Sequence, residues 1–359
     1  MEIGFLKSKD PRCPVSETSA KKFGKLDVNL QIENGLGQDL NLNLEQLDGV
    51  VDKSRSEILS QADIVYSSDP LSGDELSQMK QDAILVSFYA PFNADNQVSS
   101  LEGNQIQVFS MDMIPRTTLA QSMDVLSSMA SIAGYKAVLL AAEKLPRYFP
   151  MMMTAAGTVK PATVLILGAG VAGLQAIATA RRLGAKVEVF DVRAAVKEEV
   201  QGLGGKFIEV EGATDNKDAG GYAVEQTAEF KQRQKDKIAE RVANADVVIT
   251  TAQLRGRPAP TLVTTAMVNN MKYGSVIIDL AASTGGNCEL TEGETTINHN
   301  GIQIIGDSHL ANSALIDASA LLSNNIYNFT QQFVKEGQVT VDLENEIIAK
   351  SRIYTYENS

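Results

Sequence analysis

Hydrogen-bonding side chains cluster in the stretch RTTLAQSMDVLSS, residues 116–128 of this 359-residue chain. The residue pattern predicts a helix over 121–144, and residues three and four apart on a helix are neighbours. Four polar residues should then share one face near its start: Gln121, Asp124, Ser127 and Ser128. Such a face can orient a polar ligand or simply be solvated, and the residue types alone favour the solvated face. Arg116 is, by the same reasoning, more typical of a surface arginine than of a ligand-binding one.

A glycine-rich loop, GAGVAG at 168–173, gives the strongest chemical signal. It follows an apolar strand and opens an amphipathic helix, and the next strand ends at Asp191. In this context Gly168 permits a tight turn, Gly170 allows the backbone to approach a pyrophosphate, and Gly173 lets helix and strand pack closely. The helix N-terminus then presents free N–H groups to the phosphates, together with Val171 and Ala172. The loop therefore predicts a dinucleotide site.

The residue that ends the next strand indicates which dinucleotide binds. Asp191 lies 18 residues after Gly173 (173 to 191) and can accept hydrogen bonds from both ribose hydroxyls of an adenosine. The same carboxylate would repel a 2′-phosphate, so NAD(H) is favoured over NADP(H). Arg193, two residues later, leaves room for the alternative.

Composition excludes several classes of protein. The chain has 44% apolar and 21% charged residues, which is typical of a globular protein, and its net charge of −12 argues against nucleic acid as the main partner. The two cysteines, Cys13 and Cys288, indicate neither a disulfide framework nor a metal site. No signal peptide is visible, and the apolar run 164–180 contains glycines and reads as strand, turn and helix. We expect a soluble, cytosolic protein.

The elements that must position these residues alternate between strands and helices, which predicts βαβ units on parallel sheets. The fold expected is α/β, with two doubly wound parallel-sheet domains, a cleft between them, and the second domain a Rossmann domain. We expect a discontinuous first domain over 1–125 and 312–359, and a nucleotide domain over 126–311. Strands are expected at 3–6, 28–32, 64–66, 84–89 and 106–111 in the first domain, and at 163–167, 186–190, 207–210, 246–250, 275–280 and 302–305 in the second.

Other polar residues carry weaker signals. His299 and His309 have no obvious carboxylate partner, so we expect structural roles, with His299 in a turn. The glycine-rich segment 211–223 is either a passive loop or a lid over the nucleotide. The residues after the strand 246–250 can line the site, because ligands bind at the carboxyl ends of parallel strands. They are Thr251, Ala252, Gln253 and Leu254, with Asp279 on the next strand as structural or polar support.

The motifs together resemble the NAD(H)-binding component of proton-translocating nicotinamide nucleotide transhydrogenase over nearly the whole chain. The resemblance rests on R-x-x-x-A-Q-S-M-D-x-L-S-S-M-A-x-I-A-G-Y from Arg116 to Tyr135, on GAGVAGLQAI, on VITTAQLRGRPAP and on GSVIIDLAASTGGNCE. The first and last motifs are far more specific than the glycine loop. The resemblance implies hydride transfer between NADH and NADP⁺ held by a partner, coupled to proton translocation.

The resemblance also implies roles for individual residues. It assigns Arg116, Gln121, Asp124 and Ser127 as catalytic, around the nicotinamide. It assigns cofactor contacts to Thr117, Thr118, Leu119, Ser122 and Met123, to Gly168, Gly170, Val171, Ala172 and Gly173, to Asp191, Val192 and Arg193, and to Leu254. Gly221 and Tyr222 match a mobile loop that closes over the nucleotide. No metal is implied.

Alanine dehydrogenase shares this fold and is the alternative function. That family uses four substrate residues, of which Arg12 matches the arginine, while Tyr66, Ala90 and Ser283-Thr284 stand at the lysine, histidine and aspartate positions. Amino-acid oxidation moves a proton with the hydride and needs a base. Direct transfer between two nicotinamides needs only positioning. A non-catalytic NAD(H)-binding protein is a third possibility.

The resemblance further implies partners. We expect a homodimer that docks on an NADP(H)-binding beta subunit and on membrane-spanning transhydrogenase subunits, without nucleic acid and without direct membrane insertion. The location implied is cytoplasmic, peripheral to the inner membrane through those subunits. The stretch 307–325 departs from the family pattern, so docking details there stay open.

Overall fold

The computed structural model describes residues 1–93, 96–210 and 228–356. The chain divides into two compact units, each described here by itself. Unit 1 comprises residues 1–129 and 314–359, and unit 2 comprises residues 130–313. These divisions lie four and two residues after the expected positions 125 and 311 (129 − 125 and 313 − 311). The first falls within helix α4 (Val125–Lys144).

Unit 1 is built on a seven-stranded sheet in the order β18-β6-β5-β4-β1-β2-β3. Strands β1 to β6 are parallel and β18 pairs antiparallel at one edge. The parallel strands follow the doubly wound order 3-2-1-4-5-6. The strands are β1 (Glu2–Phe5), β2 (Asn29–Glu33), β3 (Val50–Lys53), β4 (Ile64–Tyr66), β5 (Ile84–Ser87), β6 (Gln107–Ser110) and β18 (Arg352–Thr355).

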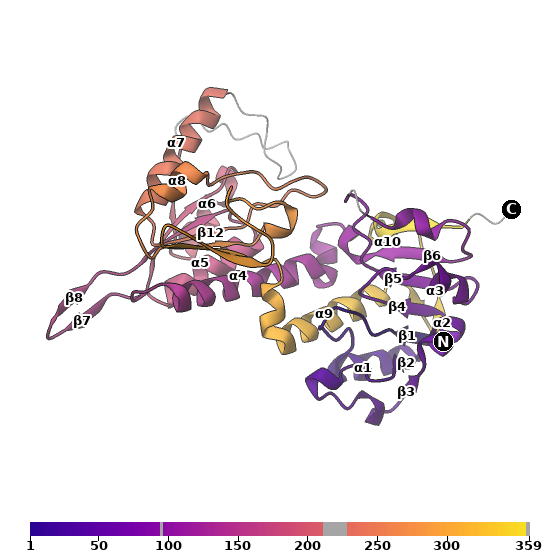
Figure 1. Cartoon of the computed structure of the whole chain (residues 1–359). Coiled ribbons are helices and arrows are strands. Elements are labelled where there is room, and N and C mark those ends of the chain that lie inside the picture. The colour runs from indigo at the N-terminus through magenta and orange to yellow at the C-terminus, as the bar shows by residue number, and fades with distance from the viewer. Residues whose placement is uncertain (94–95, 211–227, 357–359) are drawn as a thin grey trace. The chain divides into compact units, whose positions relative to one another are not determined.

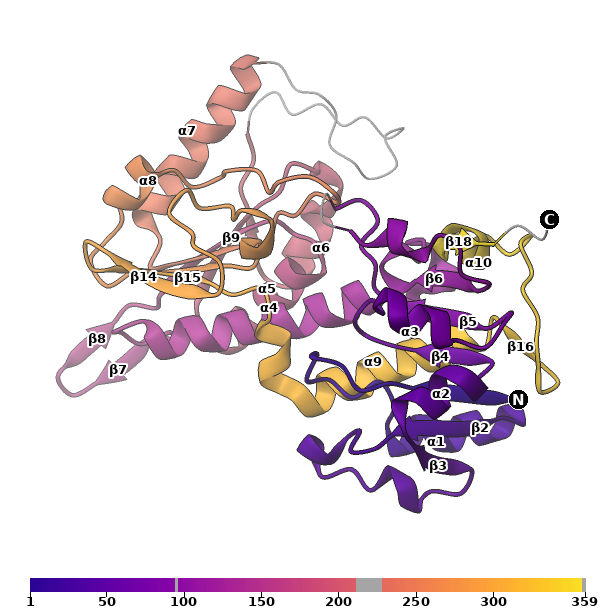
Figure 2. The same cartoon turned by 45° about the vertical axis from the view of Figure 1, so that its right-hand side comes forward.

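Helices cover both faces of this sheet. In β4, Ile64 and Tyr66 join the core on the side of α1 and α9, whereas Val65 joins the core on the side of α2 and α3. Figures 1 and 2 show α9 running along the strands of unit 1. Strands buried on both faces read as continuous apolar runs, which is why the sequence located them. The helices are α1 (Glu17–Phe23), α2 (Arg55–Gln61), α3 (Gly73–Gln78), α9 (Leu315–Thr330) and α10 (Glu346–Ser351).

Unit 2 has a second doubly wound sheet, ordered β11-β10-β9-β12-β13-β15-β14. All pairs are parallel except β14 with β15. The expected two-domain α/β fold, with a Rossmann order in the second domain, is confirmed. Its strands are β9 (Thr163–Leu167), β10 (Lys186–Phe190), β11 (Lys206–Phe207), β12 (Val247–Thr250), β13 (Val276–Asp279), β14 (Thr295–His299) and β15 (Ile302–Gly306), and its helices are α5 (Val171–Arg182), α6 (Lys197–Gly202), α7 (Ala228–Asn244) and α8 (Thr265–Asn269).

Within the two seven-stranded sheets, three strands escaped the sequence patterns: β3, β14 and β18. All three lie at sheet edges. An edge strand has one neighbour and faces solvent, so its residues alternate weakly or are polar throughout. In β14 no residue is buried. His299, expected in a turn, is instead the last residue of β14.

The helix expected over 121–144 is two elements. Residues 118–123 form the 3₁₀ helix η6 (Thr118–Met123), and α4 begins only at Val125. Asp124 separates them because its backbone is extended, with ψ 90°, and its Oδ1 accepts a 2.8 Å hydrogen bond from the Ser127 N–H. An aspartate that caps a helix in this way ends one helical segment and starts another.

Within the described part of the chain, α4 is the one helix long and apolar enough to cross a membrane by length and composition. Core helices of globular domains pass the same test. In unit 2 the residues Ala137, Val138 and Ala141 of α4 pack into the core beneath the sheet. Beyond the end of α4, the hairpin β7 (Met152–Thr154) and β8 (Gly157–Val159) projects from unit 2 (Figures 1 and 2).

Candidate functional site

The glycine loop of unit 2 joins β9 to α5, and each of its three glycines meets a different structural requirement. Gly168 adopts φ 109°, and a Cβ there would lie 2.4 Å from Thr251 Oγ1. A Cβ on Gly173 would lie 1.9 Å from the Gly168 carbonyl oxygen. At Gly170 a Cβ would meet no atom within 4 Å. The first and third glycines therefore serve packing, and the second faces open space that a ligand can enter.

Helix α5 begins directly at this open space. Gly170 is its N-cap, and no side chain caps the first turn. The N–H groups of a first helical turn have no partner within the helix, and the helix dipole adds partial positive charge there. Val171 is 43% exposed at this position. The arrangement can hold an anionic group such as a pyrophosphate.

A residue that the sequence patterns missed supports this helix. A Cβ on Gly134 of α4 would lie 2.1 Å from the Ala172 carbonyl oxygen. The glycine thus allows α4 to approach the first turn of α5 at backbone contact. In the sequence, Gly134 interrupts an otherwise apolar helical pattern, and a glycine inside a helix usually has a packing reason.

Asp191 lies just beyond the end of β10, with 6% of its side chain exposed. Its Oδ2 accepts a 2.7 Å hydrogen bond from the Ala169 N–H in the glycine loop. Arg193 donates three more, from its backbone N–H (2.8 Å), Nε (3.0 Å) and a terminal nitrogen (2.9 Å). Burial raises the pKa of Asp191, but these donors outweigh it, and the pKa lies below its usual value. The carboxylate is ionised at neutral pH.

The segment around η6 in unit 1 carries the other predicted residues. Arg116, Thr118, Leu119, Gln121 and Ser122 are exposed, with Leu119 at 83%. The side chain of Met123 is buried in the unit 1 core, so only its backbone is available for a ligand, and Thr117 precedes η6 as its N-cap.

Asp124 and Ser127 are partners of each other. The Ser127 hydroxyl donates to Asp124 Oδ2 at 2.6 Å, in addition to the backbone bond that caps α4. Both residues are half-buried. The capping geometry fixes the two side chains at the N-terminus of α4, where they present hydroxyl and carboxylate oxygens rather than a free base.

The loop after β12 is held by a buried polar network. Asp279 at the end of β13 is fully buried and accepts hydrogen bonds from Thr250 of β12 and from the segment that follows β13. Its neighbour in the network, Asn287, bonds the Ala252 N–H and carbonyl at 2.9 and 2.8 Å. Leu254 follows two residues later and is 46% exposed. The donors to Asp279 are Thr250, Ala281, Asn287, Cys288 and Thr291.

Comparisons with known proteins cover both units. A family model described as "Alanine dehydrogenase/PNT, N-terminal domain" matches residues 6–133, and "Alanine dehydrogenase/PNT, C-terminal domain" matches residues 137–358. The chain belongs to the alanine dehydrogenase/PNT family. The resemblance that the motifs predicted is thereby confirmed.

Within the alanine dehydrogenase/PNT family, the chain is similar to transhydrogenase alpha subunits. It is 41% identical to the first of the parts that make up the NAD(P) transhydrogenase alpha subunit of Rhodospirillum rubrum, over 97% of this chain and 95% of that one. A solved transhydrogenase from Sinorhizobium meliloti matches with a TM-score of 0.86 and 37% identity, over 98% of both chains. A solved L-alanine dehydrogenase matches with a TM-score of 0.74 over 98% of this chain and 94% of that one, but at 22% identity it shares the fold alone.

Two of the residues at positions expected to match alanine dehydrogenase substrate residues, Arg12 and Tyr66, have partners within the protein. Arg12 is paired with Asp10, which accepts from its Nε at 2.9 Å. Tyr66 is buried, and its hydroxyl donates to Met111 Sδ at 3.3 Å. Burial also raises the pKa of Tyr66. Neither residue is free to hold an oxo acid.

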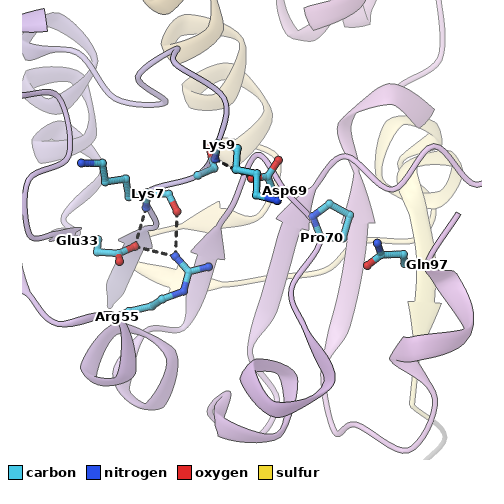
Figure 3. A pocket seen from close by; sticks show the side chains of 8 residues that line it. Lys7, Lys9, Glu33, Arg55, Asp69, Pro70 and Gln97 are labelled. Atoms are coloured by element: carbon cyan, nitrogen blue, oxygen red, sulfur yellow. Dashed lines mark hydrogen bonds and ion pairs between the residues drawn. The ribbon is translucent and has the colours of Figure 1, made fainter. Parts of the chain in front are cut away.

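A cavity of about 620 Å³ lies at the carboxyl ends of β1, β2 and β4 in unit 1 (Figure 3). Its arginine, Arg55, is bound by Glu33 at 2.8 Å and Glu75 at 2.6 Å. The Lys7 backbone N–H also donates to Glu33. The Arg55 guanidinium is thus already paired with two carboxylates. The lining residues are Lys7, Ser8, Lys9, Glu33, Arg55, Asp69, Pro70 and Gln97.

The two histidines have partners within unit 2. His299 Nε2 is 2.7 Å from Asn269 Oδ1, and His309 is 71% exposed and 4.0 Å from Glu294. Gly221 and Tyr222 lie outside the residues that the structure describes, as does the whole of the segment 211–223. In the described part of the chain no His, Cys, Asp or Glu cluster could hold a metal ion.

Proposed function

We propose that this chain is the NAD(H)-binding component of a proton-translocating transhydrogenase. It binds NAD(H) and exchanges hydride with NADP(H) held by a separate beta subunit. One observation carries the proposal: the uncapped N-terminus of α5 faces open space at Gly170, and an ionised Asp191 stands at the end of the adjacent strand. Phosphate charge and a ribose diol are the two features of a dinucleotide that these groups recognise.

The adenosine half of the nucleotide binds unit 2. The N–H groups of the first turn of α5, at Val171, Ala172 and Gly173, hold the pyrophosphate. Asp191 accepts hydrogen bonds from the ribose hydroxyls, with Val192 and Arg193 beside it. Leu254 supplies an exposed apolar surface from the loop after β12. The bonds from Arg193 must yield in part to the ribose, since they occupy the same two oxygens.

The nicotinamide half meets the residues around η6 in unit 1. Arg116, Gln121 and Ser127 offer donors that can orient the carboxamide, and Asp124 fixes Ser127 through the cap of α4. Exposed Leu119 offers an apolar surface to the ring.

NADH supplies the hydride, which passes to NADP⁺ and yields NAD⁺ and NADPH without a proton changing hands at this chain. The residues of this chain therefore bind and orient, and none must act as a base. Asp124 caps α4 and accepts a hydrogen bond from the Ser127 hydroxyl, and this arrangement suits a role in orienting a ligand.

We further propose a homodimer that uses α4 and the hairpin β7–β8. Every residue of the two hairpin strands is exposed, and a two-stranded hairpin alone is marginally stable in water. Methionines stand on or beside it, with Met153 at 76% and Met151 at 57% exposed. Such apolar surface is typical of an obligate interface, and a second copy of the chain is the occupant.

The dimer is tested by measuring molar mass in solution. Met153→Asp should shift the chain from dimer toward monomer, because a charge in an apolar interface must be desolvated without a partner. The control is Gln81→Asp, which adds the same single negative charge at an exposed position of unit 1 outside the hairpin. A monomeric wild-type chain would contradict the dimer.

Hydride transfer is tested by mixing the chain with its NADP(H)-binding partner and following transfer from NADH to an NADP⁺ analogue. We expect transfer only when both proteins are present. The complete enzyme would place this chain at the cytoplasmic face of the membrane through its partner subunits. NADH formation from alanine and NAD⁺ by the chain alone would instead favour the dehydrogenase, and binding without either activity would favour a non-catalytic role.

A further inference from the structure

The 3₁₀ helix η6 needs support from outside itself. It runs for six residues, Thr118–Met123, whereas 3₁₀ runs longer than three or four are uncommon. Its apolar residues Ala120 and Met123 are buried in the same core cluster as Leu322 and Ile326 of α9. Helix α9 is thus the element on which η6 rests.

Two asparagines of α9 also bind the backbone of η6. The Nδ2 groups of Asn325 and Asn328 both donate to the Ser122 carbonyl, at 2.8 and 3.0 Å. They stand three residues apart, so they share one face of α9. Ser122 lies between Gln121 and Asp124, at the junction where η6 ends and α4 begins. The backbone of the proposed nicotinamide segment is therefore clamped at its centre.

Asn325 has a buried polar atom that argues against a purely stabilising role for this residue. Asn325 is 5% exposed, and its Oδ1 has no hydrogen-bond partner among the described residues. A buried acceptor without a donor lowers the stability of the folded state. Leucine has nearly the same shape and no such acceptor. We therefore explain the asparagine at position 325 by the hydrogen bond that its amide donates to the Ser122 carbonyl, and not by a gain in folding stability.

We propose that Asn325 and Asn328 are positioning residues for hydride transfer. They hold the Ser122 carbonyl and thereby fix the direction in which Gln121 and Asp124 present their side chains to the nicotinamide. The inference rests on the proposed function. It places in the stretch 307–328 a role in positioning the ring that no motif in the sequence indicated.

The test separates binding of the nicotinamide ring from binding of the rest of the nucleotide. The variants are Asn325→Leu and Asn328→Ala, and the matched control is Asn324→Ala on the same helix. Asn324 bonds Lys22 and the Ala320 carbonyl and does not contact η6. Each full-length variant is measured for affinity to NADH, affinity to ADP-ribose, thermal midpoint, and transfer rate with the NADP(H)-binding partner.

We expect hydride transfer to fall about tenfold or more in Asn325→Leu. A smaller fall is expected in Asn328→Ala, which leaves one amide in place. Affinity for ADP-ribose should stay within about twofold, because that ligand lacks the nicotinamide. The midpoint of Asn325→Leu should be unchanged or higher, and Asn324→Ala should resemble the wild type in all four measurements.

Unchanged transfer in both clamp variants would overturn the inference. Parallel losses of midpoint, ADP-ribose affinity and transfer would also overturn it, because they would indicate a structural role. In both cases transfer by the wild type, and its loss in Gln121→Ala, would leave the proposed function standing. No transfer by the wild type with its partner would overturn the proposed function and this inference together.

Discussion

The carboxylate of Asp191 and the backbone N–H of Ala169 are joined by a 2.7 Å hydrogen bond. The bond ties the end of β10 to the glycine loop that follows β9, so the carboxylate proposed to bind a ribose and the loop proposed to bind a pyrophosphate are held at a fixed separation. The bond from Ala169 sets the orientation of the carboxylate before any nucleotide arrives, whereas the three bonds from Arg193 occupy the oxygens that the ribose would use. Preorganisation of this kind lowers the entropy lost on binding.

Replacing Asp191 by alanine should weaken NADH binding about 10- to 100-fold. Hydrogen bonds to a charged group contribute roughly 1.5–3 kcal/mol each, and each 1.4 kcal/mol is about tenfold in affinity. A fluorescence titration with NADH measures the change. Asp236→Ala, on the exposed surface of α7, is the control and should leave the affinity as it is. An unaltered affinity in Asp191→Ala would refute the nucleotide assignment.

Replacing Arg193 by alanine should sharpen discrimination between NADH and NADPH. The guanidinium neutralises much of the Asp191 charge, and its removal exposes a 2′-phosphate to stronger repulsion. Since Arg193 is 36% exposed, solvent screening limits the effect to about 1 kcal/mol, or roughly fivefold in the ratio of the two dissociation constants. A smaller preference for NADH in the variant would instead show that Arg193 acts mainly by orienting Asp191.

Two glycines of one loop should respond differently to alanine. Gly173→Ala forces a methyl group against the Gly168 carbonyl and should destabilise unit 2 by about 1–3 kcal/mol, seen as a lower thermal midpoint. Gly170→Ala meets no neighbour and has an ordinary φ of −78°, so folding should survive. Its methyl group enters the open space and should weaken NADH binding. A Gly170→Ala protein that binds NADH normally would place the pyrophosphate elsewhere.

Asp191 also predicts the direction of a pH effect on stability. Its folded-state pKa is depressed, so its contribution is fully present above the unfolded pKa of about 3.9 and is lost as the pH falls through the folded value. The difference in thermal midpoint between wild type and Asp191→Asn should be constant from pH 8 to about 5. It should shrink below pH 4. A difference that changed between pH 6 and 7 would point to a histidine rather than to this carboxylate.

The sequence by itself determined the elements whose signals are local. The glycine loop, the strand before it and Asp191 after the next strand follow from spacing, because each serves a contact within one βαβ unit. Helix α1 has a local signal of the same kind, because the Ser16 side chain caps it by accepting a hydrogen bond from the Ser19 N–H. Buried parallel strands were visible as apolar runs for the same reason: both of their faces are covered.

Only the tertiary structure decided the features that join distant residues. The clamp from Asn325 to Ser122 spans 203 positions, and no periodicity links a side-chain amide to a carbonyl at that distance. The break at Asp124 and the 3₁₀ form of η6 depend on that packing as well, so the pattern read as one helix. The pairing of Arg193 with Asp191 and of Arg12 with Asp10 needed coordinates for another reason: the partners stand only two residues apart, but a charge in a sequence does not indicate its partner. Local interactions determine the helices and strands, and tertiary packing determines how these elements position the residues of the candidate site.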